Sequence, residues 1–327
     1  MRVAVLCAFL LGALASSPAS ASEGLAWKWD APRRFQIFAD VKLAEWLTFT
    51  KSHNVDARVT SFLLGVTASC ADTGRGSKRT VEVGCTIEDL QIEAVSTESD
   101  QGRLQPILDE IDQKLVGAQV RILHGDDGRV KNYDVDGLDK DWRRENLMAE
   151  TLRLVLGRAF AALDLQLPRK GDDRGRAWRQ TGVLALAVPS AHGSVGQSTV
   201  DHQVGKVSGT RVEITSAGRG VVGSGAMIQV APGGPERPAN MYDMTIHSVA
   251  VFDTALGTLL ERQYLAEGSP TASSLASEGT KGTTYVQAVR LRLIPDGVDA
   301  PPLGPNREVL RDETDADEPA AGPPADG

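Results

Sequence analysis

The chain has 327 residues, of which 41% are hydrophobic and 24% are charged, so it can bury a core and is not disordered as a whole. Its net charge of −8 argues against a nucleic-acid partner. The sequence holds no cysteine pair with zinc spacing, no phosphate-binding loop and no strong catalytic motif. We therefore expect no metal site, no cofactor and no enzymatic activity.

Residues 1–21 contain the three parts of a secretory signal in their usual order. Arg2 gives a positive start, Val3–Ala15 is apolar but too short to span a bilayer, and Ala19–Ala21 offers a small-residue cleavage site. Cys7 lies inside the apolar run, ahead of that site, where it is not placed to carry a lipid anchor. No later run is long enough to span a membrane. We expect cleavage near Ala21 and a soluble exported protein, either periplasmic or extracellular.

Two cysteines remain after cleavage, Cys70 and Cys85. The segment between them, residues 71–78, is rich in turn residues, and strand-like patterns flank it. An exported protein meets an oxidising compartment, so we expect a disulfide that joins the two strands of a hairpin. The alternative is a pair of free, redox-active thiols, but the spacing is not Cys-x-x-Cys.

The first half of the chain alternates strand-like and helical patterns. Apolar residues recur at helical spacing through residues 104–116, at Leu104, Ile107, Leu108, Ile111 and Leu115. A hairpin turn is expected at Gly125–Gly128, between two further strands. The strand-like runs of this half are residues 34–41, 45–50, 55–69, 79–96, 119–124 and 129–135.

A longer amphipathic helix is predicted over residues 142–163. Its apolar stripe consists of Met148, Leu152, Val155, Leu156, Ala159, Phe160 and Leu163. Such a stripe normally packs on a sheet. If the interior also holds a ligand, the expected lining is Leu108, Met148, Leu152, Val155 and Phe160; otherwise these five residues are ordinary core.

From Trp178 to Ile294 the chain consists of strand-like runs separated by turns. The runs are residues 182–188, 195–204, 210–215, 225–230, 241–252, 258–265 and 284–294. No β-α-β rhythm occurs, so the sheet should be antiparallel. The fold class is α+β: a large curved antiparallel sheet with two helices, about 104–116 and 142–163, packed on one face. We expect a single β-rich domain over residues 22–294, or alternatively a subdivision near residues 168–176.

Residues 295–327 form a distinct C-terminal segment. They hold seven of the sixteen prolines and nine acidic residues against two basic ones. Little apolar surface is available here to offset the entropy lost on ordering. We expect a disordered acidic tail, which solvates the protein or serves as a binding arm.

The middle of the chain resembles a family of uncharacterised exported β-rich bacterial proteins, of the domain-of-unknown-function type. The matching features are the step Gly137–Leu138 after a hairpin, the helix 142–163, the pair Leu167–Pro168, and Gly175 with Trp178. The resemblance covers roughly residues 118–190 and implies no enzymatic activity. The helix-and-curved-sheet architecture is also distantly similar to the periplasmic lipoprotein-carrier fold, whose concave face binds acyl chains.

Acidic residues cluster between the hairpin and the second helix. Asp134, Asp136 and Glu145 fit positions 1, 3 and 12 of a calcium loop, but position 6 is Asp139 instead of the required Gly. Asp139 or Asp141 more simply caps the helix, whose N-terminus favours negative charge.

Signals for a hydrolase are weak. His192 and His202 could approach each other across a hairpin, as a metal pair or a general base, but no His-Glu-x-x-His motif exists. Gly223–Gly225 lacks the leading glycine of a nucleophile elbow, and the glycine-rich residues 218–225 are expected to form a tight turn between strands.

Together these features predict a non-enzymatic exported envelope protein. It would hold a hydrophobic or lipidic ligand between sheet and helices. The alternative is a structural or protein-interaction module of the envelope, whose partner is another envelope protein and which holds no small molecule. A cavity lined only by apolar groups favours a ligand, and a solid core with an exposed apolar patch favours a protein partner. A cleft with convergent carboxylates or a buried histidine favours the third and weakest hypothesis, a hydrolase.

Overall fold

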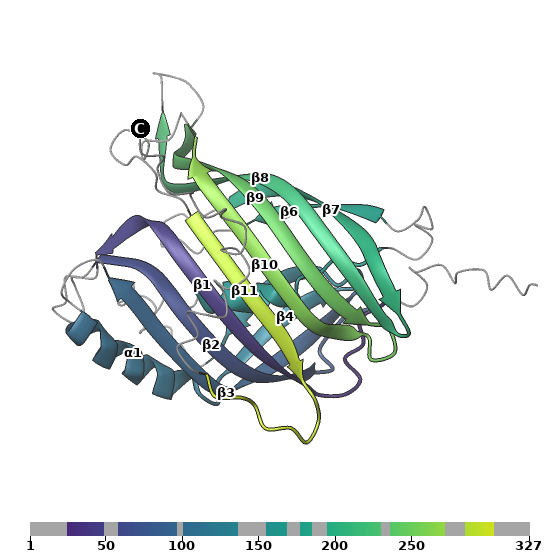
Figure 1. The fold of residues 1–327 in the computed structure, drawn as a ribbon. Helices are drawn as coiled ribbons and strands as arrows, with labels where there is room; N and C mark the ends of the chain where they lie inside the picture. Colours follow the sequence, from purple (N-terminus) through teal and green to yellow (C-terminus); the bar gives the residue numbers. More distant parts are fainter. Residues whose placement is uncertain are drawn as a thin grey trace, which may run out of the picture.

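The computed structural model describes residues 25–48, 58–96, 101–136, 155–168, 177–184, 195–229, 236–271 and 285–303. Within them one sheet of eleven strands dominates (Figure 1). The strands are β1 Arg33–Thr48, β2 Arg58–Asp72, β3 Thr80–Ser96, β4 Gln119–Gly125, β5 Val130–Val135, β6 Ala177–Leu184, β7 Val195–Ser208, β8 Arg211–Gln229, β9 Glu236–Asp253, β10 Thr258–Pro270 and β11 Tyr285–Ile294. The predicted signal peptide lies outside the described residues.

The strand order is β5-β4-β3-β2-β1-β11-β10-β9-β8-β7-β6, and every neighbouring pair is antiparallel. Each half of the chain forms a run of sequential strands, and the first and last strands join the two halves, with Arg34 opposite Ile294. The sheet curves strongly (Figure 1), so β4, near one end of the strand order, lies behind the front strands in that view. The predicted large, curved antiparallel sheet is thus confirmed.

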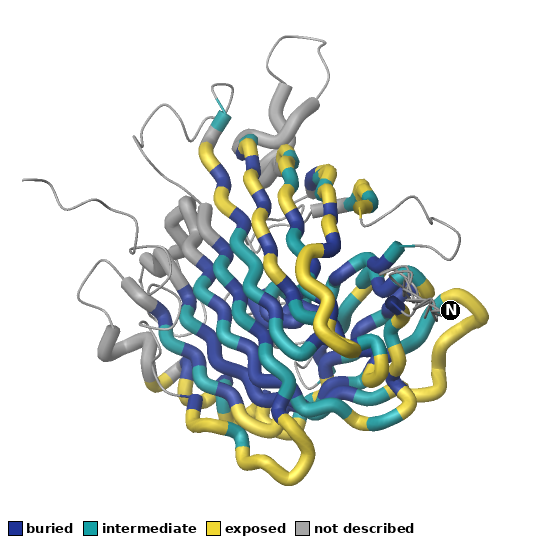
Figure 2. Tube along the Cα trace, turned by 45° about the vertical axis from the view of Figure 1, so that its right-hand side comes forward, coloured by how far each residue is buried: buried dark blue, intermediate teal, exposed yellow. Residues whose placement is uncertain are grey.

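The inside of this curve, here called the inner face, carries most of the core. Along β9 the buried residues Tyr242, Met244, Ile246, Ser248, Ala250 and Phe252 alternate with more exposed ones (Figure 2). A strand with one face on the core and one toward water has this period of two. The corresponding residues of β1 and β2 are Phe35, Ile37, Ala39, Val41, Phe62, Leu64, Val66 and Ala68.

One predicted turn is instead part of a strand. Residues 218–225, expected to form a tight turn, lie in the middle of β8, which runs without a break from Arg211 to Gln229. The glycines allow β7 and β8 to approach each other closely. A Cβ added at Gly218 would lie 2.7 Å from the Thr199 backbone oxygen, and one added at Gly220 would lie 2.8 Å from the Gln197 backbone oxygen. The predicted strands 210–215 and 225–230 are therefore two parts of one strand.

The hairpin turn between β4 and β5 is confirmed. Gly128 has a φ of 77°, in the left-handed region that favours glycine. An added Cβ there would also lie 2.0 Å from the Trp27 indole nitrogen, so the position excludes larger residues for a second reason.

The first predicted helix is α1, Gln101–Leu115, which begins three residues earlier than expected. It packs against β3, beyond the point at Thr86 where pairing of β3 with β4 ends. The chain leaving the helix bonds back to this strand, because Gly117 N–H donates to the Ile87 oxygen (2.8 Å) and Ile87 N–H donates to the Ala118 oxygen (3.0 Å). The helix thus covers a free stretch of strand edge (Figure 1).

The second predicted helix is described from Val155 onward. Residues 155–160 are α-helical and Ala161–Leu163 continue as a 3-10 turn, η1. This segment contacts the inner face at β10 and β11. The part predicted over residues 142–154 and the proposed subdivision near 168–176 fall largely outside the described residues.

Cys70 and Cys85 form the predicted disulfide. They lie directly opposite each other on β2 and β3, with their sulfurs 2.08 Å apart. Both side chains are buried in the core.

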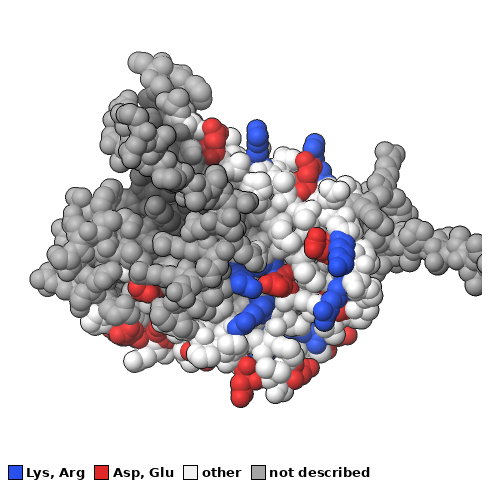
Figure 3. All heavy atoms as spheres, in the orientation of Figure 1, with Lys and Arg blue, Asp and Glu red and all other residues white. Residues whose placement is uncertain are grey.

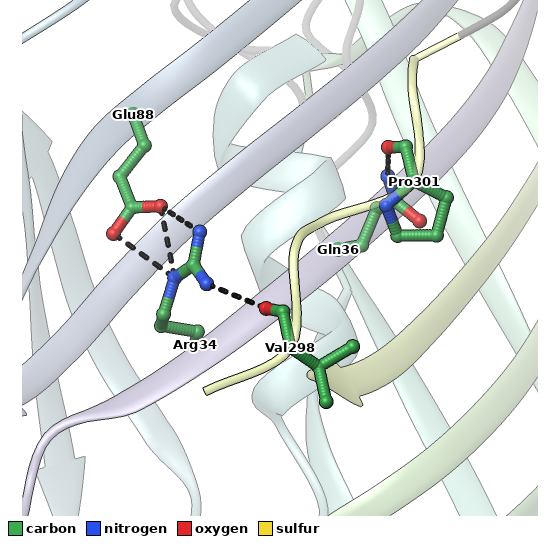
Figure 4. A network of polar contacts seen from close by, with 5 residues as sticks. All are labelled: Arg34, Gln36, Glu88, Val298 and Pro301. Atoms are coloured by element: carbon green, nitrogen blue, oxygen red, sulfur yellow. Dashed lines mark hydrogen bonds and ion pairs between the residues drawn. The ribbon is translucent and has the colours of Figure 1, made fainter. Parts of the chain in front are cut away.

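The start of the predicted disordered tail is corrected. Residues 295–303 cross the outer face of β1 and β2 (Figure 4), where Arg34 Nη1 donates to the Val298 oxygen (3.1 Å) and Gln36 Nε2 to the Pro301 oxygen (2.6 Å). Leu303 is buried and packs against Gly65. These contacts anchor nine residues whose composition alone indicated disorder; residues 304–327 lie outside the described part.

Among the described residues, no helix is long and apolar enough to cross a membrane.

Candidate ligand-binding face

A row of directly opposed residues crosses the inner face from one half of the sheet to the other. Each member is the register partner of the next. In order from β6 to β3 the row is Trp178, His202, Ser216, Ser248, Tyr264, Val289, Ala39, Leu64 and Ile92. Its first five members carry polar groups and its last four are aliphatic, so the row changes character between β10 and β11.

Arg262 is the charged residue on the polar side of this face. It is 4% exposed. Its Nε donates to Ser248 Oγ (3.0 Å), and its Nη1 donates to the backbone oxygens of Ala162 (2.9 Å) and Asp164 (2.8 Å). The guanidinium also lies over the Tyr264 ring, with Cζ 5.3 Å from the centroid.

An irregularity in β10 places Arg262 inside. The register with β9 shifts between Leu259 and Glu261, so Leu259 opposes Phe252 and Arg262 opposes Ala250, both on the inner face. In a regular strand, residues three apart lie on opposite faces. The extra residue therefore turns Arg262 from the outer face to the inner one.

His202 lies in a second set of buried polar contacts. Its Nδ1 is 2.8 Å from Ser216 Oγ, its Nε2 is 3.0 Å from Gln180 Oε1, and its ring stacks on Trp178 at 5.1 Å. Burial, and secondarily the charge of Arg262, lowers the pKa of His202 to about 4. The ring is therefore neutral at physiological pH.

The segment after η1 ties the two edges of the sheet together. Val130 N–H donates to Asp164 Oδ1 (2.9 Å) from β5, and Trp178 Nε1 donates to the Gln166 oxygen (2.9 Å) from β6. Trp27 Nε1 donates to the Leu165 oxygen (3.1 Å). Trp178 therefore anchors the start of β6.

One end of the interior is closed by an aromatic cluster. The Trp27 and Trp29 rings stack at 5.4 Å, and His124 lies 5.6 and 5.4 Å from them. His124 is 1% exposed, and neither of its ring nitrogens has a hydrogen-bond partner. Burial lowers its pKa to about 4, although the Gly128 backbone lies close enough to oppose this shift.

The predicted lining residues are partly described. Leu108, Val155 and Phe160 are all buried in the one hydrophobic core, Leu108 from α1 and the other two from the segment on the inner face. Met148 and Leu152 lie outside the described residues. Whether the five line a ligand stays a prediction.

The other candidate sites resolve into structural contacts. Asp134 and Asp136 both pair with Arg121, at 3.1 and 2.6 Å, while Asp139, Asp141 and Glu145 are outside the described part. Among the described residues no cluster of ligands could hold a metal ion. His202 is buried with Ser216, and its suggested partner His192 is not described.

The sequence did not single out Arg262, Tyr264 or Ser248. Each lies in a run that was recognised as strand-like, but the run gives no indication of which residues oppose each other. The detectable signal is a charged residue three positions after Leu259, within a strand that alternates regularly farther along.

No protein-family model and no curated protein matches the chain. Among solved structures, the chain is similar to a lipovitellin structure titled for its lipid–protein interactions, with 9% identity and a TM-score of 0.42. The likeness covers 83% of this chain and 26% of that chain. A similarity of this extent defines neither a family nor a ligand for this protein.

Proposed function

We propose that this chain is an exported, non-enzymatic protein that binds a hydrophobic, lipid-like ligand against the inner face of its sheet. The observation that carries the proposal is the opposed row from His202 to Ile92, polar on one side and aliphatic on the other. Binding faces for small ligands combine a mostly apolar surface with a few placed polar groups.

The extent of the inner face supports this proposal. β9 has 18 residues and is about 60 Å long. The helical run 155–163 is about 13 Å long, so of the described residues it can cover a small part of the face. The aliphatic residues of the row are nevertheless buried, so a ligand at this part of the face packs among the core side chains.

A hydrolase is less well supported, although Ser216, His202 and Gln180 form a hydrogen-bonded chain. A serine nucleophile needs N–H donors aimed at the developing oxyanion. Ser216 lies inside β8, where both neighbouring strands pair with it and occupy the backbone donors. With a pKa of about 4, His202 is also a weak base.

The alternative, a protein-interaction module of the envelope, predicts an exposed apolar patch. The exposed large hydrophobic residues of the described part are scattered over different elements, at Val116, Val207, Val221, Val249, Leu256 and Val298. On the face shown in Figure 3, acidic and basic side chains are interspersed. The partly exposed ion pairs Arg34–Glu88 and Arg290–Glu261 likewise join opposite charges. Neither pattern favours a particular protein partner.

Export is supported by the disulfide between Cys70 and Cys85, because such bridges persist in oxidising compartments. It is tested by fractionating a Gram-negative host that expresses the full chain. We expect the protein in the periplasm or the medium, starting near residue 22. Uncleaved protein in the cytosol would contradict export without bearing on ligand binding.

Ligand binding is tested first by native mass spectrometry of residues 22–327 purified without detergent. A discrete extra mass that organic solvent removes supports the proposal. The stripped protein is then titrated with the uncharged fluorescent probe N-phenyl-1-naphthylamine, and we expect saturable enhancement at about one probe per chain.

A matched pair of variants locates the binding. Ala39 is buried in the row on the inner face, whereas Ala217 is exposed on the other side of β8. Ala39→Met should weaken probe binding several-fold, because the longer side chain fills space on the inner face, and Ala217→Met should not. Circular dichroism checks that both fold. A clean apo mass together with no probe enhancement would refute the proposed function.

A further inference from the structure

The guanidinium of Arg262 is buried and forms no ion pair with any described residue. Its three hydrogen bonds go to a hydroxyl and two backbone oxygens. Buried charges in proteins are normally paired. The positive charge of Arg262 is therefore the unbalanced feature of the inner face.

The nearest acidic group is poorly suited to balance it. Asp164 faces Arg262 with its backbone oxygen, while its carboxyl oxygen Oδ1 accepts from Val130 N–H. Burial raises the pKa of Asp164, against the opposing effects of that hydrogen bond and of Arg262. The charges of Arg129 and Arg158 act on this carboxyl as well, so Asp164 does not balance Arg262 alone.

Two donors beside this charge have no partner. Arg262 Nη2 and Tyr264 Oη make no hydrogen bond within the described part of the chain. Neither is among the fully buried unpartnered atoms, so both keep some accessible surface. Ser248, directly opposite Tyr264 on β9, accepts from Arg262 Nε and so has its own hydroxyl proton available.

From this geometry we propose that Arg262, Tyr264 and Ser248 form a site for the carboxylate of a long-chain fatty acid. The inference rests on the proposed function and names its ligand class. Arg262 Nη2 supplies the charge-assisted hydrogen bond, and the two hydroxyls donate to the remaining lone pairs.

A carboxylate suits the site better than a phosphate. Arg262 supplies one positive charge at the hydrogen-bonding position, and His202 is neutral. The charge of Arg158 also acts on Tyr264, but it is set against Asp164, so the site balances one negative charge. Arg262 also offers one free terminal nitrogen and not the two-nitrogen fork that phosphate binding uses. A dianionic headgroup would remain partly uncompensated in this buried position.

The acyl chain has a matching surface next to the site. From Tyr264 the row continues through Val289, Ala39 and Leu64 to Ile92. That path crosses four strand spacings and is about 19 Å long. These four residues are buried in the hydrophobic core, so an acyl chain along the row takes the place of the side chains that now cover them.

The test compares palmitate with its uncharged methyl ester, both displacing N-phenyl-1-naphthylamine from the stripped protein. We expect palmitate to bind about 10- to 100-fold more tightly, which is the range for a charge-assisted hydrogen bond. Acetate at millimolar concentration should not displace the probe, because it lacks the chain. Acetate competing as well as palmitate would overturn the fatty-acid assignment.

Variants separate the headgroup site from general lipid binding. Arg262→Met should bring palmitate down to the affinity of the ester, and Arg262→Lys should restore part of the difference. Tyr264→Phe should weaken palmitate about fivefold and leave the ester unchanged. If Arg262→Met does not fold, Tyr264→Phe alone still tests the site, because the Tyr264 hydroxyl makes no hydrogen bond within the described part of the chain. The control is Arg290→Met, on the next strand, where the side chain pairs with Glu261.

The two proposals fail differently. Equal affinity of the wild type for acid and ester, or an unchanged preference in Tyr264→Phe and Arg262→Met, refutes the carboxylate site while lipid binding stands. If neither palmitate nor its methyl ester displaces N-phenyl-1-naphthylamine, and the protein binds neither of them, the proposed function itself is refuted.

Discussion

Replacing His124 by phenylalanine should stabilise the protein. The imidazole is 1% exposed between Trp27 and Trp29, and both its nitrogens lack a hydrogen-bond partner. An unsatisfied buried polar group costs about 1–3 kcal/mol. Phenylalanine has a similar shape and removes that cost, and it gives up only the contact of the imidazole with the Gly128 backbone, which falls short of hydrogen-bond geometry. We therefore expect His124→Phe to gain about 1–2 kcal/mol at pH 7.5.

The gain should grow in acid. The pKa of His124 falls from 6.5 to about 4 on folding, so between these values the unfolded chain binds the proton and the folded chain does not. Stability from this group is complete above pH 6.5 and is lost as the pH falls toward 4. At pH 5 the loss is about 2 kcal/mol, from 1.36 kcal/mol per pKa unit. The variant should escape this loss.

Urea unfolding followed by far-UV circular dichroism at pH 7.5 and pH 5 measures both effects. Other buried groups also change the stability with pH. Burial raises the pKa of Asp112 to about 7, which stabilises the fold as the pH falls, whereas the lowered pKa of His202 destabilises it. Both contributions are the same in wild type and variant, so they cancel in the comparison. His247→Phe, on the exposed side of β9, controls for loss of a histidine. Equal acid sensitivity of His124→Phe and wild type, or a less stable variant at pH 7.5, would refute the reasoning.

Three further predictions concern the rest of the sheet and use the same unfolding assay. Replacing Cys70 and Cys85 by serine should cost about 3 kcal/mol, and reductant should have the same effect on the wild type; insensitivity to both would contradict a stabilising bridge. Leu303→Ala should cost about 2 kcal/mol, since Leu303 is buried against the outer face; no loss would mean that residues 295–303 do not contribute to stability. Arg121→Gln should cost less than about 1 kcal/mol, because its ion pairs are partly exposed, and a larger loss would indicate a buried network.

Local patterns predicted the strands well where one face meets the core. The run 241–252 alternates strictly, and it forms the central part of β9. The turn 125–128 and the disulfide were predicted for similar local reasons, because a turn and its two flanking strands lie within a few residues of each other. Such features need no knowledge of the rest of the fold.

The pairing of β1 with β11 could not be predicted in this way. Arg34 and Ile294 are far apart in the sequence, and neither strand carries a pattern that specifies the other. The order of residues 295–303 could not be predicted either. Their composition indicates disorder, but Pro301 and Leu303 contact Gln36 and Gly65 on the outer face of the sheet. Tertiary contact overrides composition at both places.

The candidate site depends on the least predictable feature of all, the one-residue irregularity in β10. If β10 were regular, Arg262 would lie on the face opposite to Leu259, the solvent-facing side, where a charged residue is ordinary. The extra residue before Glu261 reverses this and puts a positive charge opposite Ala250, beside Ser248 and Tyr264. Burying a guanidinium is costly, and a fold that needed only packing would be served by an apolar residue at this position. Within the described chain Arg262 donates to Ser248 and to the Ala162 and Asp164 oxygens, and the proposed carboxylate would give its remaining terminal nitrogen a partner.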